Sequence, residues 1–255
     1  IHYYDEVSSS LQAEPAAIIA DWTDISSQYN MPASIKLYKT TTSVTGRSIN
    51  AWYAVADMSA GDLELRTIKT SSATKPSVAA KNLGGVQIAI NGGFFGGGQS
   101  YSYVMDQGME TATGVKAVTR SYYGDANRNS VSRSFNITRG AFGVNKNQKP
   151  SVKWLYGSYM SAYDAPLPAY NSGPVLQPTS TYPAAKHTWD VYSAIGGGPI
   201  ILHDGHLCID YLTVKDKGNG GRYIGNPELL DDDIFVPSRR PPRTAIGHTA
   251  DGKIV

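Results

Sequence analysis

The chain has 255 residues, 41% of them hydrophobic, and can therefore bury a substantial core in one large domain or two small ones. Its 23 basic and 21 acidic residues give a net charge of +2, so no strong overall field indicates a nucleic acid or an anionic membrane as partner. The sequence contains no run of about 18 apolar residues, which argues against a membrane-spanning helix.

The composition and the first residue bear on where the protein acts. Only 17% of the residues are charged, whereas Gly (26) and Tyr (17) are abundant, a composition typical of β-rich, loop-rich proteins outside the cytosol. The chain begins at Ile1 rather than Met, and we expect that a leader peptide or a tag has been removed, so the lack of a leader does not indicate the cytosol. The sequence therefore predicts a secreted, periplasmic or cell-surface protein.

Residues 1–45 are predicted to form a partly helical N-terminal extension. Residues 11–22 carry a helical pattern of apolar positions, with Pro15 near the first turn. The remaining residues, 46–255, are predicted to form the main domain.

The first half of this region reads as short strands and one helix. Residues 76–83 predict a helix that stops at Gly84-Gly85. Residues 86–90 are almost entirely apolar and predict a strand buried on both faces. Further strands are predicted over residues 51–56 and 63–68, and another over residues 35–38, near the end of the extension.

The second half is β-rich and interrupted by two long loops, residues 164–186 and 215–239. Hairpin turns are predicted at Asp204-Gly205 and Asp251-Gly252. We identify no internal repeat. The predicted fold is α+β, with a largely antiparallel or mixed β-sheet core, a few helices and long loops at one end. Strands are predicted over residues 134–138, 140–144, 152–156, 190–195, 200–203, 206–212, 245–246 and 253–254.

Cys208 is the only cysteine in the sequence, which excludes an internal disulfide and any multi-cysteine metal site. It lies between Leu207 and Ile209 in a strand-like run. This setting favours a small buried hydrophobic residue over a nucleophile.

Glycine-rich turns follow two of the predicted strands, at residues 91–93 and 196–198. Because glycine has no Cβ, the backbone N–H groups of such turns can approach a ligand closely. Glycine clusters also mark ordinary tight turns and bulges, and that alternative remains open. The candidate ligand-binding positions in the two turns are Gly92, Gly93, Gly197 and Gly198.

Arg243 is the candidate anion-binding residue. The preceding Pro241-Pro242 hold the approach extended, and the hydrophobic pair Ala245-Ile246 follows at once. We therefore expect Arg243 at the mouth of a buried strand, where its planar fork matches a phosphate or carboxylate. The alternative is a surface ion pair with the acidic residues 231–233.

Thr244 and His248 belong to the same short motif as Arg243. With a reference pKa of about 6.5, a histidine can act as an acid, a base or a hydrogen-bond donor near neutral pH. The alternative for His248 is a strand-end histidine that caps the Asp251-Gly252 turn.

No pair of carboxyl groups is singled out by spacing, although glycoside cleavage commonly uses two. Asp106, Glu110 and Asp190 are candidates. Asp106 follows a strand-like run and is a candidate substrate-binding residue, with a solvated loop acid as the alternative. No cofactor is predicted. A divalent metal is compatible with phosphodiester hydrolysis, but the sequence shows no metal-ligand spacing.

Several motifs together resemble the phosphodiester glycosidase family. They occur in the family's order and cover roughly residues 50 to 255. The motifs are NGGFF at residues 91–95, the glycine stretch before Pro199, the Asp204-Gly205 turn, and RTAIGH at residues 243–248 followed by Asp251-Gly252-Lys253.

The resemblance implies an extracytoplasmic hydrolase that cleaves a sugar resembling N-acetylglucosamine from a sugar-1-phosphodiester, or a related cell-envelope glycan substrate. It implies that Asn91, Gly92 and Gly93 form one side of the site. Arg243, Thr244 and His248 form the other. In this reading Arg243 binds the phosphate, His248 acts in proton transfer or orientation, and Asn91 binds a sugar or phosphate oxygen.

Two departures from the family pattern are visible. Family members continue with another strand, a helix and a glycine-rich loop of the type LDGGGS, so we expect the domain at residues 46–255 to be incomplete at its C-terminal end. Residues 96–98 and the tyrosine-rich stretch after them also differ from the animal members of the family, so the sugar specificity of those members need not apply here.

A non-catalytic carbohydrate or cell-envelope binding module on the same fold is the alternative function. It predicts an exposed aromatic platform, whereas the enzyme requires Asn91, Arg243 and His248 to converge. The aromatic residues that could form such a platform, or simply pack in the core, are Trp52, Tyr101, Tyr103, Trp154 and Tyr156.

Overall fold

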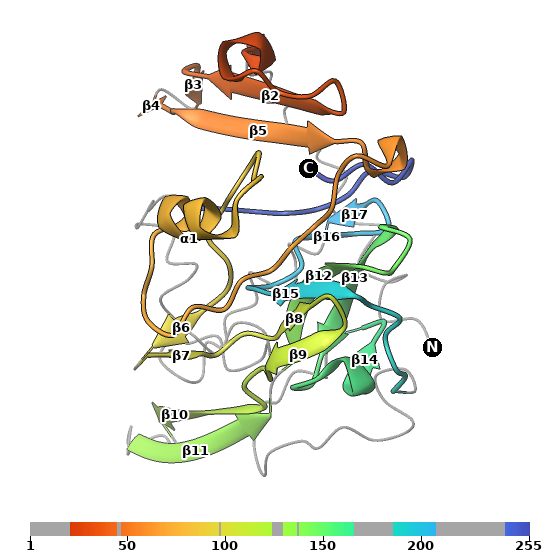
Figure 1. Ribbon diagram of the computed structural model, residues 1–255. Coiled ribbons are helices and arrows are strands. Elements are labelled where there is room, and N and C mark those ends of the chain that lie inside the picture. Colours follow the sequence, from red (N-terminus) through yellow and green to blue (C-terminus); the bar gives the residue numbers. More distant parts are fainter. Residues whose placement is uncertain are drawn as a thin grey trace. The chain divides into compact units, whose positions relative to one another are not determined.

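The computed structural model describes residues 21–44, 47–96, 98–123, 130–136, 138–165, 186–207 and 243–255 (Figure 1). The chain divides into two units after Asp57, with Val255 assigned to the first unit. The predicted boundary between residues 45 and 46 stays a prediction. Most of the predicted helix at residues 11–22, Cys208 and the loop at residues 215–239 lie outside the described residues.

The first unit contains a three-stranded antiparallel sheet in the order β1-β2-β5. The predicted strands at residues 35–38 and 51–56 are confirmed, because Tyr38 pairs with Tyr53 in the ladder and their rings stack with centroids 4.6 Å apart. The elements are β1 (Thr23–Asp24), η1 (Ser26–Tyr29), β2 (Ile35–Thr40), the hairpin β3 (Ser43–Val44) and β4 (Arg47–Ser48), and β5 (Ala51–Ala56).

The second unit is built on a six-stranded antiparallel sheet in the order β14-β13-β12-β15-β8-β9 (Figure 1). Trp154, Tyr163 and Ile200 form one buried cluster, and Tyr103, Met105, Leu155 and Trp189 belong to another. The strands are β8 (Val104–Asp106), β9 (Met109–Ala112), β12 (Arg139–Val144), β13 (Pro150–Leu155), β14 (Ala162–Tyr163) and β15 (Ser193–Gly196).

One α-helix, two short 3-10 helices and three hairpins complete the described part of the second unit. The helix α1 (Pro76–Leu83) has the predicted bounds, because proline suits a first helical turn and Gly84, at φ 75°, ends it. The other elements are η2 (Met58–Ala60), β6 (Phe95–Gly96) with β7 (Gln99–Ser100), β10 (Ala117–Tyr123) with β11 (Ser130–Asn136), η3 (Tyr159–Ser161), and β16 (Leu202–His203) with β17 (His206–Leu207).

The predicted fold class is confirmed as a mostly antiparallel β-structure with minor helix. Both predicted hairpin turns are also confirmed. Asp204 and Gly205 adopt φ values of 49° and 80°, and Gly252 adopts 84°, as tight turns of this kind require.

Three predicted strands are wrong. Residues 245–246 form no strand and Ala245 is exposed, so Arg243 does not lie at the mouth of a buried strand as expected. Residues 86–90 form no strand pairing within the described chain, and Ile90 is 50% exposed there. An apolar run provides a hydrophobic surface but not a neighbouring strand edge, so periodicity alone misplaced it. Residues 63–68 also form no strand. Side chains rather than a ladder bind their backbone: the Leu65 N–H donates to Oε1 of Gln148, in the turn between β12 and β13, and the Thr67 N–H donates to Oδ1 of Asp106 in β8.

Candidate functional site

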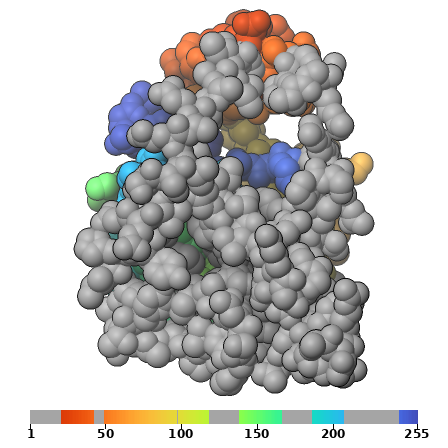
Figure 2. Space-filling view, turned by 180° about the vertical axis from the view of Figure 1, so that it is seen from behind, coloured from red at the N-terminus to blue at the C-terminus, as the bar shows by residue number. Residues whose placement is uncertain are grey.

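The two motifs that frame the site meet in the folded chain. The Thr244 hydroxyl donates a hydrogen bond of 2.7 Å to Asn91 Oδ1, joining residues 153 positions apart in the sequence. Both residues are exposed. Figure 2 shows part of residues 243–255, in blue, at the surface of the molecule. The structure thus brings the RTAIGH segment against the NGGFF loop on an accessible part of the second unit.

The NGGFF loop is held by contacts that only glycine permits. A Cβ on Gly93 would lie 2.1 Å from the Gly196 carbonyl oxygen and 2.2 Å from Ser102 Oγ. The Phe94 N–H donates to the same Ser102 Oγ at 2.7 Å, and the Tyr101 N–H donates to the Phe94 carbonyl at 2.8 Å. The buried Ser102 therefore fixes the loop against the end of β15.

The second glycine turn lies against the same loop. The Gly196 N–H donates to the Tyr103 carbonyl at 2.7 Å, and the Gly197 N–H donates to the Gly140 carbonyl at 2.9 Å. A Cβ on Gly198 would lie 3.7 Å from Phe94 Cζ. The Gly197 amide is thus engaged in extending the sheet, while Gly198 packs beside the NGGFF loop.

A buried arginine also contacts this loop. Arg139, the first residue of β12, is 9% exposed. Its guanidinium carbon lies 4.8 Å from the centroid of the Phe94 ring, in a cation–π contact. Sequence reasoning missed Arg139, Phe94 and Ser102 as parts of the site.

Arg243 and His248 lie at the two ends of an exposed segment. Arg243 directly precedes Thr244, which places its backbone next to the contact with Asn91. The His248 ring lies 6.3 Å from the Phe142 ring, with its Nδ1 3.1 Å from the Thr249 carbonyl oxygen. His248 also forms an antiparallel bridge with Ile254.

The turn that follows His248 carries an ion pair. Lys253 Nζ lies 2.6 Å from Asp251 Oδ2, and the Thr249 hydroxyl also donates to Asp251. These bonds, that of Lys253 first, lower the pKa of Asp251 to about 2. Asp251 is therefore ionised throughout the physiological pH range.

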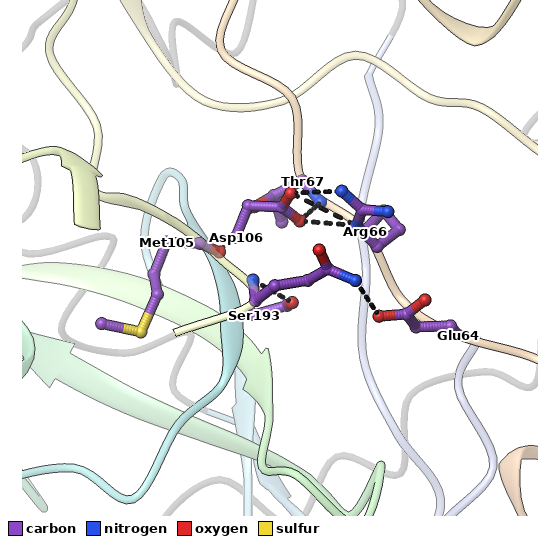
Figure 3. Close-up of polar contacts among 7 residues, drawn as sticks. Glu64, Arg66, Thr67, Met105, Asp106 and Ser193 are labelled. Atoms are coloured by element: carbon purple, nitrogen blue, oxygen red, sulfur yellow. Dashed lines mark hydrogen bonds and ion pairs between the residues drawn. The ribbon is translucent and has the colours of Figure 1, made fainter. Parts of the chain in front are cut away.

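The Asp106 carboxylate accepts hydrogen bonds from Arg66 and Thr67 of the same chain (Figure 3). Arg66 Nη2 lies 2.7 Å from its Oδ2, Arg66 Nε donates to the same carboxylate, and the Thr67 N–H donates to Oδ1 at 3.0 Å. Burial alone would raise the pKa of Asp106, but the bonds from Arg66 and Thr67 outweigh it and lower the pKa below its ordinary value. This geometry fastens residues 66–67 to β8.

We expect Asp106→Asn to lower the free energy of unfolding by about 1–2 kcal/mol at pH 7, because charged hydrogen bonds are lost. The folded-state pKa of Asp106 lies below the unfolded value of about 3.9. Its contribution is therefore complete above that value and is lost as pH falls through the folded-state pKa. Urea unfolding between pH 7 and pH 2 should show the two proteins converging in acid.

The matched control is Asp190→Asn, since Asp190 is exposed and its contact with Asn145 Nδ2 is long, at 3.4 Å. It should change stability by less than about 0.5 kcal/mol. Equal effects of the two substitutions, or a constant gap between Asp106→Asn and wild type down to pH 2, would contradict the assigned role of the carboxylate.

Thr244→Val should leave stability within about 0.5 kcal/mol of wild type, because the hydrogen bond it removes is exposed. It should shift the orientation of Asn91 and reduce kcat/KM for a reaction at this site about 3- to 10-fold. Thr244→Ser retains the hydroxyl and should keep most of the activity. Steady-state kinetics of both variants measures the contribution of the hydroxyl. Equal kcat/KM values for Thr244→Val and Thr244→Ser would contradict a role for it.

Within the described ranges, no group of three or more His, Cys, Asp or Glu side chains is placed to hold a metal ion. Nor is any helix there both long and apolar enough to cross a membrane.

The chain belongs to the phosphodiester glycosidase family, whose family model matches residues 84–255. The match covers more than half of the chain and includes the NGGFF loop, β12, the glycine turn at residues 196–198 and the RTAIGH segment. Comparisons with curated proteins and with solved structures give no match. Membership suggests hydrolysis of sugar phosphodiesters as the family's activity.

Proposed function

We propose that this protein hydrolyses a sugar-1-phosphodiester outside the cytosol and releases a sugar of the N-acetylglucosamine type. The proposal is supported by family membership and, above all, by the hydrogen bond between Thr244 and Asn91. That bond joins the two segments on which a sugar-phosphate site would have to be built.

In this reaction water adds to the anomeric carbon and the bond from that carbon to the phosphate oxygen breaks. The bonding electrons remain on the departing phosphomonoester, which is a stable anion. Protonation of the leaving group therefore matters less than in an ordinary glycoside, and the reaction tolerates the absence of a recognised carboxyl pair. The main task of the protein is to hold and neutralise the phosphate.

The exposed segments divide this work between them. Arg243 binds the phosphate through its planar guanidinium. Asn91 binds a sugar or phosphate oxygen, next to the backbone of Gly92 and Gly93. His248 acts in proton transfer or in orienting the substrate.

The burial of the aromatic residues does not favour a carbohydrate-binding module. Tyr103 is 2% exposed and Trp154 is fully buried, so both pack in the core of the second unit. Trp52 and Tyr101 are exposed but belong to different units. We therefore propose the hydrolase rather than the binding module.

The deciding experiment is hydrolysis of N-acetylglucosamine-1-phosphodiesters by the full chain. A neutral methyl glycoside of the same sugar is the matched substrate, and a parallel reaction contains a chelator. Turnover of the diester with little turnover of the neutral glycoside would support the proposal. Sugar binding without turnover of any of several sugar-1-phosphodiesters would overturn it in favour of a binding module.

A further inference from the structure

Two segments of the chain have related sequences, which corrects the expectation that no internal repeat exists. Residues 139–149 read RGAFGVNKNQK, and residues 243–253 read RTAIGHTADGK. The two align without gaps at an offset of 104 positions (139 to 243). They are identical at the positions of Arg139, Ala141, Gly143 and Lys149. Because the identities are few and scattered, the likeness is easily overlooked in the sequence.

The first copy is a hairpin formed by β12 and β13. The Asn145 N–H donates to the Lys149 carbonyl at 3.1 Å, and the Gln148 N–H donates to the Asn145 carbonyl at 2.9 Å. Gln148 has a positive φ of 58°, and Val144 pairs with Pro150.

The second copy repeats this backbone pattern at the equivalent positions. The Thr249 N–H donates to the Lys253 carbonyl at 2.9 Å, and the Gly252 N–H donates to the Thr249 carbonyl at 3.0 Å. Gly252 has a φ of 84°, and His248 bridges to Ile254. Since turn and register agree over residues 144–150 and 248–254, the gap-free alignment makes Arg139 and Arg243 equivalent positions of two related segments.

Both copies begin beside the NGGFF loop. Arg139, which opens the first, contacts Phe94 through its guanidinium at 4.8 Å. Thr244, the second residue of the other copy, binds Asn91 at 2.7 Å. Asn91 and Phe94 are three positions apart, so their Cα atoms are separated by at most about 11 Å. Arg139 thus contacts this short loop at Phe94, and Arg243 directly precedes the residue that contacts it at Asn91.

We propose that Arg139 is the second arginine of the anion site, so that each copy of the hairpin supplies one guanidinium to the substrate phosphate. A cation–π contact holds the guanidinium against Phe94, and burial strengthens its attraction for an anion. This inference rests on the proposed function for the identity of the anion, a phosphodiester. The chemistry of the site is the bidentate binding of phosphate oxygens by arginine.

The test compares wild type with Arg139→Met and Arg139→Lys, using hydrolysis of an N-acetylglucosamine-1-phosphodiester and calorimetric titration with inorganic phosphate. Arg139→Met should raise KM, and weaken phosphate binding, by about 10- to 100-fold. Arg139→Lys retains the positive charge but not the planar fork of the guanidinium, and its KM and phosphate affinity should lie between those of wild type and Arg139→Met. It also keeps the test decisive if the methionine variant does not fold.

The matched control is Lys149→Met, which removes one positive charge from the exposed turn of the same hairpin. It should change KM and phosphate affinity less than about twofold. Combining Arg139→Met with Arg243→Met should give a loss in phosphate affinity that differs from the product of the single losses, since residues sharing one ligand are not additive. A merely structural role for Arg139 would lower stability without this selective effect on anion binding.

The outcomes separate this inference from the proposed function. Diester hydrolysis with wild-type KM and phosphate affinity in both Arg139 variants would overturn the inference and leave the function standing. Phosphate binding that depends on Arg139, without hydrolysis of any diester, would support the anion site and overturn the function. If the wild-type protein showed no hydrolysis and no phosphate binding, both the inference and the proposed function would be overturned.

Discussion

Gly93→Ala should lower the free energy of unfolding by about 3 kcal/mol or more, at the upper end of the range for overpacking. The added Cβ would lie 2.1 Å from the Gly196 carbonyl oxygen and 2.5 Å from Ser102 Cβ. Neither neighbour is the far end of a flexible side chain, so the NGGFF loop and β15 would have to separate. Denaturant unfolding of the purified variant measures this loss directly.

Gly197→Ala is the matched control for Gly93→Ala. A Cβ on Gly197 would meet nothing within 4 Å, and alanine retains the N–H that donates to the Gly140 carbonyl. We expect a change within about 0.5 kcal/mol, or a slight gain from the reduced entropy of the unfolded chain. If the two substitutions proved equally tolerated, the close approach of the loop to β15 would be refuted.

Arg243→Ala should reduce kcat/KM on a sugar-1-phosphodiester about 10²- to 10³-fold, the loss seen when one preorganised charge-stabilising donor is removed. Its guanidinium belongs to an exposed segment, so the change in stability should stay within about 0.5 kcal/mol. Arg243→Lys keeps the charge without the planar fork and should recover only part of the activity. Steady-state kinetics beside thermal unfolding separates the catalytic loss from a folding defect.

Lys146→Ala removes the same charge from an exposed turn and controls for the overall field. It should leave kcat/KM within about twofold of wild type. Arg243→Ala with activity inside the same twofold range would remove Arg243 from the phosphate site. An equal loss on the neutral glycoside would show that its role does not concern the phosphate.

Local sequence signals located much of the secondary structure correctly. The helix α1 has the predicted bounds because Pro76 and Gly84 set its ends through their own backbone preferences. The strand β5 also matches, since aromatic and β-branched residues such as Trp52, Tyr53 and Val55 suit a pleated sheet. Residues 86–90 failed because their apolar character carries no information about which strand lies next to them.

The candidate site was only partly visible in the sequence. Asn91, Thr244 and the glycine turns lie in recognisable motifs, and the fold places Asn91 and Thr244 in contact. Phe94 lies in the NGGFF motif but was not singled out, and Ser102 carried no signal of its own, because their importance comes from a ring contact and a hydrogen bond with other segments. Arg139 carried a weak signal through the repeated hairpin, which became clear once the two turns could be compared.

By itself, the sequence determined the β-rich class, the tight turns and the family of this protein, since backbone preferences and short motifs are local properties. The tertiary structure alone decided which residues meet. It bound Asp106 to Arg66, engaged the Gly197 amide in the sheet and set Arg139 against Phe94. These contacts join segments far apart in the chain, and the packing of the sheet, rather than any local preference, brings them together.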